Sequence, residues 1–140
     1  MKLSKNFSFE ELTTTNNTYL LDKNRTEARN RLEDMECLAW FAEQIRAFVG
    51  VQMVVSSAFR CEDLNKAVGG SLNSQHLYAR AIDFVPKGIS IDECFNKIKD
   101  SKLVYGQLIK EKSGNSVWIH VGMGDKKENL IYKDGKYTRI

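Results

Sequence analysis

The chain has 140 residues, of which 42% are hydrophobic and 28% are charged, and its formal net charge is +3 at pH 7. This length predicts one domain over residues 1–140, and no membrane insertion is expected because no run of about 18 apolar residues occurs. The small positive charge comes without a stripe of aromatic and basic residues, which argues against nucleic-acid binding.

Capping patterns and apolar periodicity predict helices at residues 9–12, 25–48, 62–68 and 91–99. Ser8 and Glu11 match the capping box, in which the two side chains bond to the first free backbone N–H groups of a helix. The longest helix should bury one apolar stripe and end at Gly50, and the polar residues 13–24 before it should be a surface connection. The stripe consists of Leu32, Met35, Leu38, Ala39, Ala42, Ile45 and Val49.

Alternating and β-branched runs predict strands at residues 51–57, 81–85, 103–109 and 116–122. Pro86 should end the second of these strands, since proline cannot donate to a sheet ladder. Asp134 and Gly135 stand between two short apolar runs and predict a β-hairpin. Helices that come first and strands that follow indicate an α+β fold, with a small antiparallel sheet and helices packed on one face.

Only two histidines occur in the chain, His76 and His120. An isolated histidine is more often a packing or capping residue than a ligand, but the surroundings of these two favour a site. In one predicted strand, alternation places Asp83 on the face opposite Ile82 and Phe84. In another, it places His120 on the face opposite three apolar residues. Two imidazoles and one carboxylate, with water in a fourth position, form a standard catalytic zinc site.

Several short motifs follow one another along the chain: Ser57-Ala58-Phe59-Arg60, Asn65 to Ser71, Ser74-Gln75-His76, Ala79 to Asp83 and Trp118 to Val121. Together they resemble the signature of the M15 zinc peptidases, the D-Ala-D-Ala carboxypeptidase group. The resemblance is closest to the short branch common in bacteriophages and prophages, and it spans residues 3–122. Ala79 departs from the pattern, because the family prefers glycine there.

This resemblance implies a zinc peptidase domain of the hedgehog and D-Ala-D-Ala peptidase type, with Zn2+ held in the cleft by His76, Asp83 and His120. It also implies that Arg60 reads the substrate's carboxylate or polarised carbonyl, for which a guanidinium fork is suited. The expected partner is a bacterial peptidoglycan peptide, and the expected oligomeric state is a monomer. The further substrate-binding candidates are Ser74, Gln107 and Trp118; Trp118, like Tyr78, has packing in the core as its alternative role.

The general base is the point at which the chain departs most from the family. Many relatives carry an acid three residues before the last ligand histidine, where this chain has Val117, and some carry a histidine at the position of Trp118. The phage-type branch has Gln-x-Ile-x-Glu upstream, which corresponds here to Gln107–Glu111. Glu111 is therefore the candidate that activates the water and protonates the leaving amine. An exposed glutamate between two lysines is the alternative interpretation.

The leading functional hypothesis is a zinc-dependent metallopeptidase, acting as a carboxypeptidase or endopeptidase, that cleaves peptidoglycan peptides near D-amino acids. It would serve as a lytic enzyme of a phage or prophage, or in bacterial wall remodelling. The alternative is a catalytically inactive zinc-binding module of the same fold with a structural or wall-binding role, which the absence of an acid at Val117 favours.

Cysteine content and the N-terminal segment bear on location. The three cysteines, Cys37, Cys61 and Cys94, cannot pair evenly and are expected to be buried thiols of a reducing compartment. The first residues carry charge but no apolar signal core, so we expect cytoplasmic synthesis without a signal peptide. Such a protein would act at the bacterial wall after release, or as part of a virion.

Overall fold

The computed structural model describes all 140 residues, and the chain divides into two compact units. One unit comprises Met1–Glu43 and Val55–Ile82, and the other comprises Gln44–Val54 and Asp83–Ile140. None of the helices is both long enough and apolar enough to cross a membrane. The single domain over 1–140 stays a prediction.

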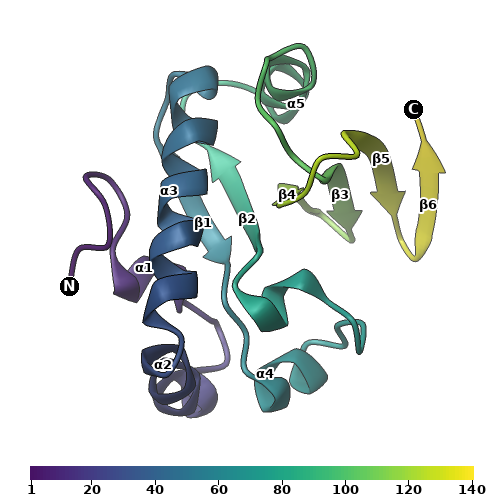
Figure 1. Cartoon of the computed structure of the whole chain (residues 1–140). Helices are drawn as coiled ribbons and strands as arrows, with labels where there is room; N and C mark the ends of the chain where they lie inside the picture. The colour runs from purple at the N-terminus through teal and green to yellow at the C-terminus, as the bar shows by residue number, and fades with distance from the viewer. The chain divides into compact units, whose positions relative to one another are not determined.

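Figure 1 labels the helices and strands along the chain. The helical elements are α1 (Phe9–Leu12), η1 (Thr18–Leu20), α2 (Leu21–Arg29), α3 (Leu32–Val49), α4 (Glu62–Ala67), η2 (Gln75–Tyr78) and α5 (Ile91–Lys99). The strands are β1 (Met53–Ser57), β2 (Ala81–Pro86), β3 (Gln107–Ser113), β4 (Ser116–Gly122), β5 (Glu128–Lys133) and β6 (Lys136–Arg139). This content confirms the α+β class.

The prediction of one long helix over residues 25–48 is wrong in one respect, because two helices, α2 and α3, occupy this part of the chain. The N–H groups of Asn30 and Arg31 donate to carbonyls three residues earlier, at 3.1 and 2.9 Å. Such tighter bonds are the usual way in which a helix ends. Leu32 begins the next helix with 38% of its surface exposed, whereas the rest of the predicted apolar stripe is buried.

The expectation that residues 13–24 form a surface connection is confirmed in part, because most of them are exposed or half-buried, but they also contain η1 and the start of α2. Asn24 is fully buried. Its amide donates to the carbonyl oxygens of Thr13 (3.0 Å) and Phe59 (3.1 Å), and its side-chain oxygen accepts from the N–H of Cys61 at 2.7 Å. A polar side chain satisfied in this way can be buried, and it ties α2 to the segment that carries Arg60.

The strands form one six-stranded sheet in the order β1-β2-β4-β3-β5-β6. Strand β3 pairs antiparallel with β4 and parallel with β5, and β5 pairs antiparallel with β6. The purely antiparallel sheet predicted from the sequence is therefore wrong, and the sheet is mixed.

The mixed pairing arises where the chain passes from β4 to β5 across the start of β3. The N–H of Gly106 donates to the carbonyl of Gly122 at 2.8 Å, and its carbonyl accepts from the N–H of Glu128 at 3.0 Å. A Cβ atom on Gly106 would lie 2.6 Å from the carbonyl oxygen of Met123, so only glycine leaves room for the crossing. Strand β3 begins at Gln107, directly after this crossing and later than the sequence predicts.

Side chains of β3 to β6 alternate between two faces of the sheet. One of these faces, which we call the site face, carries Gln107, Ile109, Glu111, Trp118, His120, Leu130, Tyr132, Tyr137 and Arg139. Helix α5 lies against the other face, where the ammonium group of Lys110 is 2.7 Å from the carboxylate of Asp92. The site face of these strands is thus the one that α5 leaves uncovered.

Strands β5 and β6 form the predicted hairpin (Figure 1). Asp134 and Gly135 have φ angles of 45° and 91°. Two successive residues in this left-handed region are what a tight two-residue hairpin turn requires. The hairpin prediction is confirmed.

The cysteine prediction is confirmed in part. Cys61 and Cys94 are buried, but Cys37 is exposed, and all three thiols are free.

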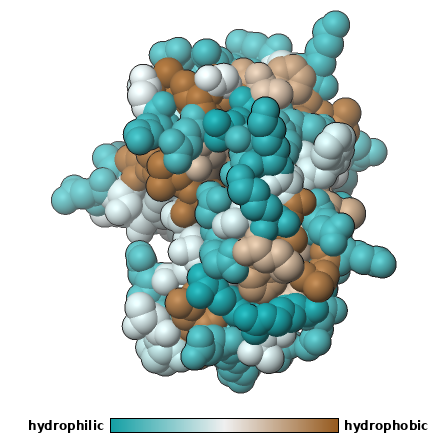
Figure 2. Space-filling model, turned by 90° about the vertical axis from the view of Figure 1, so that its left-hand side faces the viewer, coloured by the Kyte–Doolittle hydropathy of each residue, from teal (hydrophilic) through white to brown (hydrophobic).

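On the face drawn in Figure 2, hydrophobic residues form separate areas with hydrophilic residues between them.

Candidate metal centre and catalytic site

His76 lies on the short helix η2 and is 3% exposed. The backbone before it is fixed by Ser74, whose hydroxyl oxygen accepts from the N–H of His76 at 3.2 Å. The Nδ1 atom of the imidazole lies 2.6 Å from the carbonyl oxygen of Ala58. Since a carbonyl oxygen only accepts hydrogen bonds, this contact places the proton on Nδ1 and makes Nε2 the ring atom that could bind a metal.

Asp83 and His120 come from β2 and β4 and are 5% and 8% exposed. The Oδ1 atom of Asp83 lies 2.8 Å from Nδ1 of His120. Asp83 stands between Ile82 and Phe84, both fully buried, as the alternation in the sequence predicts. An ionisable pair this well buried requires mutual hydrogen bonding or a cation to offset the loss of water.

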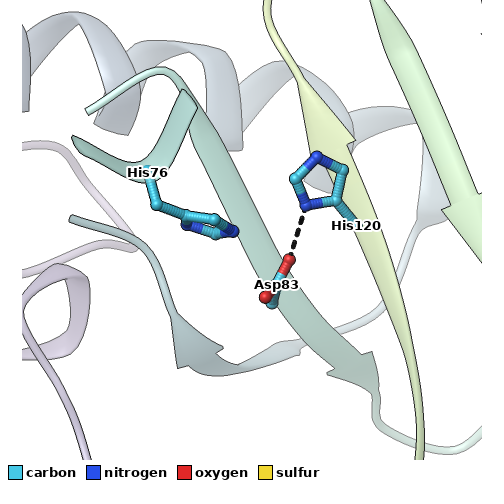
Figure 3. A group of neighbouring side chains, drawn as sticks. All are labelled: His76, Asp83 and His120. Atoms are coloured by element: carbon cyan, nitrogen blue, oxygen red, sulfur yellow. Dashed lines mark hydrogen bonds and ion pairs between the residues drawn. The ribbon is translucent and has the colours of Figure 1, made fainter. Parts of the chain in front are cut away.

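The two histidines and the aspartate form a group that could hold a metal ion. Each residue offers one ligand atom, and these atoms lie within 4.8 Å of one another. In Figure 3 the three side chains point towards one another. Ligand atoms about 2.1 Å from a tetrahedral metal lie about 3.4 Å apart, which is within the 4.8 Å spread of this group. Two imidazoles and a carboxylate also suit a divalent transition metal.

Arg60 is held in place from several directions. Its Nε donates to the hydroxyl of Ser57 at 3.0 Å, and its Nη1 donates to the side-chain oxygen of Asn65 at 3.1 Å. Its backbone N–H donates to the carbonyl of His76 at 3.0 Å. A Cβ atom on Gly70 would lie 2.1 Å from that Asn65 oxygen and 2.8 Å from Nη1 of Arg60. The absence of a side chain at Gly70 therefore leaves room for the Arg60–Asn65 pair.

Glu111 faces the same side of the sheet as His120. In the β3–β4 register Glu111 pairs with Trp118, and Ile109 pairs with His120, which puts all four side chains on the site face. Val117, where many relatives carry an acid, alternates to the opposite face. Glu111 is partly buried. This placement puts the Glu111 carboxylate and the His120 imidazole on one face of the sheet.

The three further substrate-binding candidates have different surroundings. Ser74 is occupied as the cap of η2, and the amide nitrogen of Gln107 donates to the carboxylate of Glu128 at 2.9 Å. The indole nitrogen of Trp118 is buried and has no hydrogen-bond partner.

The segment behind His76 retains the backbone that the family pattern implies. Ala79 is in the left-handed region, with φ 54° and ψ 43°, and is 1% exposed. Glycine adopts this conformation without strain, whereas alanine does so at a cost of about 1–2 kcal/mol. Tyr78 is 51% exposed, and the Arg31 guanidinium lies 5.7 Å from its ring centroid, so Tyr78 is not a core residue.

Two features of the site escaped the sequence interpretation. The carbonyl of Ala58 as the partner of His76 is a backbone contact between distant positions, which no side-chain pattern signals. Tyr132 and Tyr137 join the site face through the hairpin, and their ring centroids lie 4.7 Å apart. The Asp134–Gly135 turn and the alternation of the two strands could have predicted that Tyr132 and Tyr137 share a face.

Comparison with protein families accounts for this arrangement. The model of the peptidase M15 family matches residues 5–122, a segment that includes the His/Asp/His group, Arg60 and Glu111. A search of curated proteins finds no match. Membership of a peptidase family indicates hydrolysis of peptides with the help of a metal, and it does not favour the alternative of a non-catalytic module. Because this match covers most of the chain, the chain belongs to the peptidase M15 family.

Proposed function

We propose that this chain is a zinc-dependent metallopeptidase that cleaves bacterial peptidoglycan peptides near D-amino acids, and that it serves a phage or prophage as a lytic enzyme. The observation that carries the proposal is the buried group of His76, Asp83 and His120 within a segment matched by the peptidase M15 model. The site of action would be the bacterial wall, and the working form a monomer.

Zinc is the metal that we propose for the group. Its preferred nitrogen and oxygen ligands are those that the three side chains supply, and three protein ligands leave a position for water and substrate. Bound there, zinc would lower the pKa of its water to about 7 and polarise the scissile carbonyl. The Ala58 carbonyl supports this assignment because it orients the His76 ring for binding through Nε2.

Glu111 is the residue that we propose for proton transfer. A carboxylate on the site face could take a proton from the attacking water and deliver it to the departing amine, help that is typically worth about 10²–10⁴ in rate. The register with Trp118 supports this role, because it places Glu111 on the same face as His120. The valine at position 117 argues less against catalysis, because Glu111 supplies an acid on the site face.

Arg60 is the residue that we propose for reading the substrate's carboxylate or carbonyl. Its bonds to Ser57 and Asn65 restrict the guanidinium to one orientation. A preset orientation reduces the entropy lost on binding a planar anion. Trp118, Gln107 and Ser74 complete the proposed substrate-binding set, with Ser74 acting through the backbone of His76 and Gln107 paired with Glu128.

The test is mass spectrometry of purified peptidoglycan after incubation with zinc-loaded protein. The proposal expects new peptide fragments whose masses identify the bond, and no fragments after metal removal with a chelator. Restored cleavage on adding zinc back would separate metal loss from unfolding. Intact peptidoglycan in the presence of stoichiometrically bound zinc would contradict the proposal.

A further inference from the structure

The site face continues past Glu111 into a pair of tyrosines that the C-terminal hairpin contributes. Tyr132 is the register partner of Glu111 on one side and of Tyr137 on the other. Together with Trp118, these residues form one row across four strands, with the carboxylate between aromatic rings. The hairpin follows residue 122 and so lies outside the segment that the family model matches.

The Tyr132 and Tyr137 rings meet edge to face, with an interplanar angle of 63° and a centroid distance of 4.7 Å. Tyr137 is nevertheless 56% exposed, so a bound molecule can reach it. Burial of the phenol raises the pKa of Tyr137, and the negative charges of Glu111 and Asp83 raise it further. The Tyr137 hydroxyl is a hydrogen-bond donor on the site face.

We propose that Tyr132 and Tyr137 form a binding subsite for the peptide substrate beside Glu111. The Tyr137 hydroxyl donates to a backbone carbonyl of the peptide, and the two rings cover an apolar part of the same molecule. Peptide carbonyls accept hydrogen bonds that an ionised carboxylate cannot donate, whereas tyrosine combines a hydrogen-bond donor with an apolar ring. This inference rests on the proposed peptidase function, because it names where that substrate is held.

A purely structural role is the competing explanation, since cross-strand aromatic pairs stabilise hairpins. The variants Tyr137→Phe and Tyr137→Ala separate the two. Phenylalanine keeps the ring contact and removes the donor, whereas alanine removes both. Thr138→Ala is the matched control, because Thr138 is the next residue of β6, is exposed, and points to the opposite face. Thermal midpoint and zinc content are measured for every variant.

The substrate is a purified disaccharide–pentapeptide fragment of bacterial peptidoglycan. We expect Tyr137→Phe to raise KM about 2- to 10-fold, the range for one lost hydrogen bond, with kcat nearly unchanged. Tyr137→Ala should raise KM further, and Thr138→Ala should leave it at the wild-type value. Unchanged KM in both Tyr137 variants would overturn the inference and leave the pair as a hairpin contact only.

Binding measured by calorimetry keeps this result distinct from the proposed function. The same fragment is titrated into the zinc-loaded wild type and into each zinc-loaded variant. Where a protein cleaves the fragment during the titration, the measurement is made with the Glu111→Gln substitution added to it. If the wild type binds but does not cleave, and Tyr137→Phe weakens binding, the subsite stands and the peptidase function fails. If the wild type neither binds nor cleaves the fragment, both fail.

Discussion

The Nδ1 atom of His76 and the carbonyl oxygen of Ala58 lie 2.6 Å apart, across 18 positions of the sequence. Two residues beyond Ala58, the backbone N–H of Arg60 returns a bond to the carbonyl of His76. The motif that supplies the arginine and the motif that supplies a metal-ligand candidate therefore hold each other in place. A change that moves one of them should disturb the other.

Gly70→Ala should disturb Arg60 through this arrangement. The added methyl would lie 2.1 Å from the Asn65 oxygen and 2.8 Å from Nη1 of Arg60, so the Arg60–Asn65 pair must separate. We expect a lower thermal midpoint and a fall of about tenfold or more in kcat/KM on peptidoglycan fragments, which corresponds to about 1.4 kcal/mol in the transition state.

Gly69→Ala is the matched control for that change. Gly69 has a φ of +73°, and no atom lies within 4 Å of the position that an added methyl would take, so substitution strains the backbone without touching Arg60. It should lower stability by about 1 kcal/mol and leave kcat/KM near the wild-type value. Equal losses of activity in the two variants would show that the turn, and not the space beside Arg60, is what matters.

Glu111→Gln should retain the metal and lose hydrolysis. Glutamine keeps the size and hydrogen bonding of the side chain but cannot carry a proton at neutral pH. Removal of general acid–base help predicts a fall of at least about 100-fold in kcat, measured by fragment release with zinc content in parallel. Lys112→Gln is the control, since the neighbouring Lys112 side chain is exposed and points to the opposite face.

Wild-type turnover in the Glu111→Gln variant would assign Glu111 to the surface and not to the chemistry. Asp125 and Glu62 would then be the next residues to substitute. The metal centre would be unaffected by that outcome, because the His/Asp/His group does not depend on Glu111.

The thiols should differ sharply in reactivity. Burial raises the pKa of Cys94 to about 12, so at pH 8 only about one molecule in 10⁴ carries the thiolate that reacts. Cys37 is exposed. Brief treatment of the native protein with iodoacetamide at pH 8 should modify Cys37 and leave Cys94 intact until denaturant is added, as peptide mass spectrometry can show. Modification of both at one rate would mean that the α5 region opens readily.

The sequence predicts the elements that depend on local chemistry. The capping box at Ser8 and Glu11 is confirmed, because its partners lie within one helical turn. The Asp134–Gly135 hairpin is confirmed because its turn needs two residues that tolerate positive φ. The alternation around Asp83 also correctly predicts the buried flanking residues, Ile82 and Phe84.

The errors lie where distant parts of the chain decide the outcome. Asn24 looks like a surface residue by type, but backbone groups far from it in sequence satisfy its amide and bury it. The parallel pairing of β3 with β5 depends on the close passage of Gly124 past Gly106, which composition does not reveal. For the same reason the partner of the His76 ring could not be named in advance.

Metal stoichiometry is the most direct test of the central claim, that His76, Asp83 and His120 form a zinc centre. Purified protein is loaded with zinc, dialysed and measured by elemental analysis, beside the His76→Ala, His120→Ala double variant. Cys37→Ser serves as a control for zinc held by the exposed thiol. The proposal predicts one zinc per chain in the wild type and in Cys37→Ser, and only a small fraction in the double variant. Full zinc in a folded double variant would contradict the assignment.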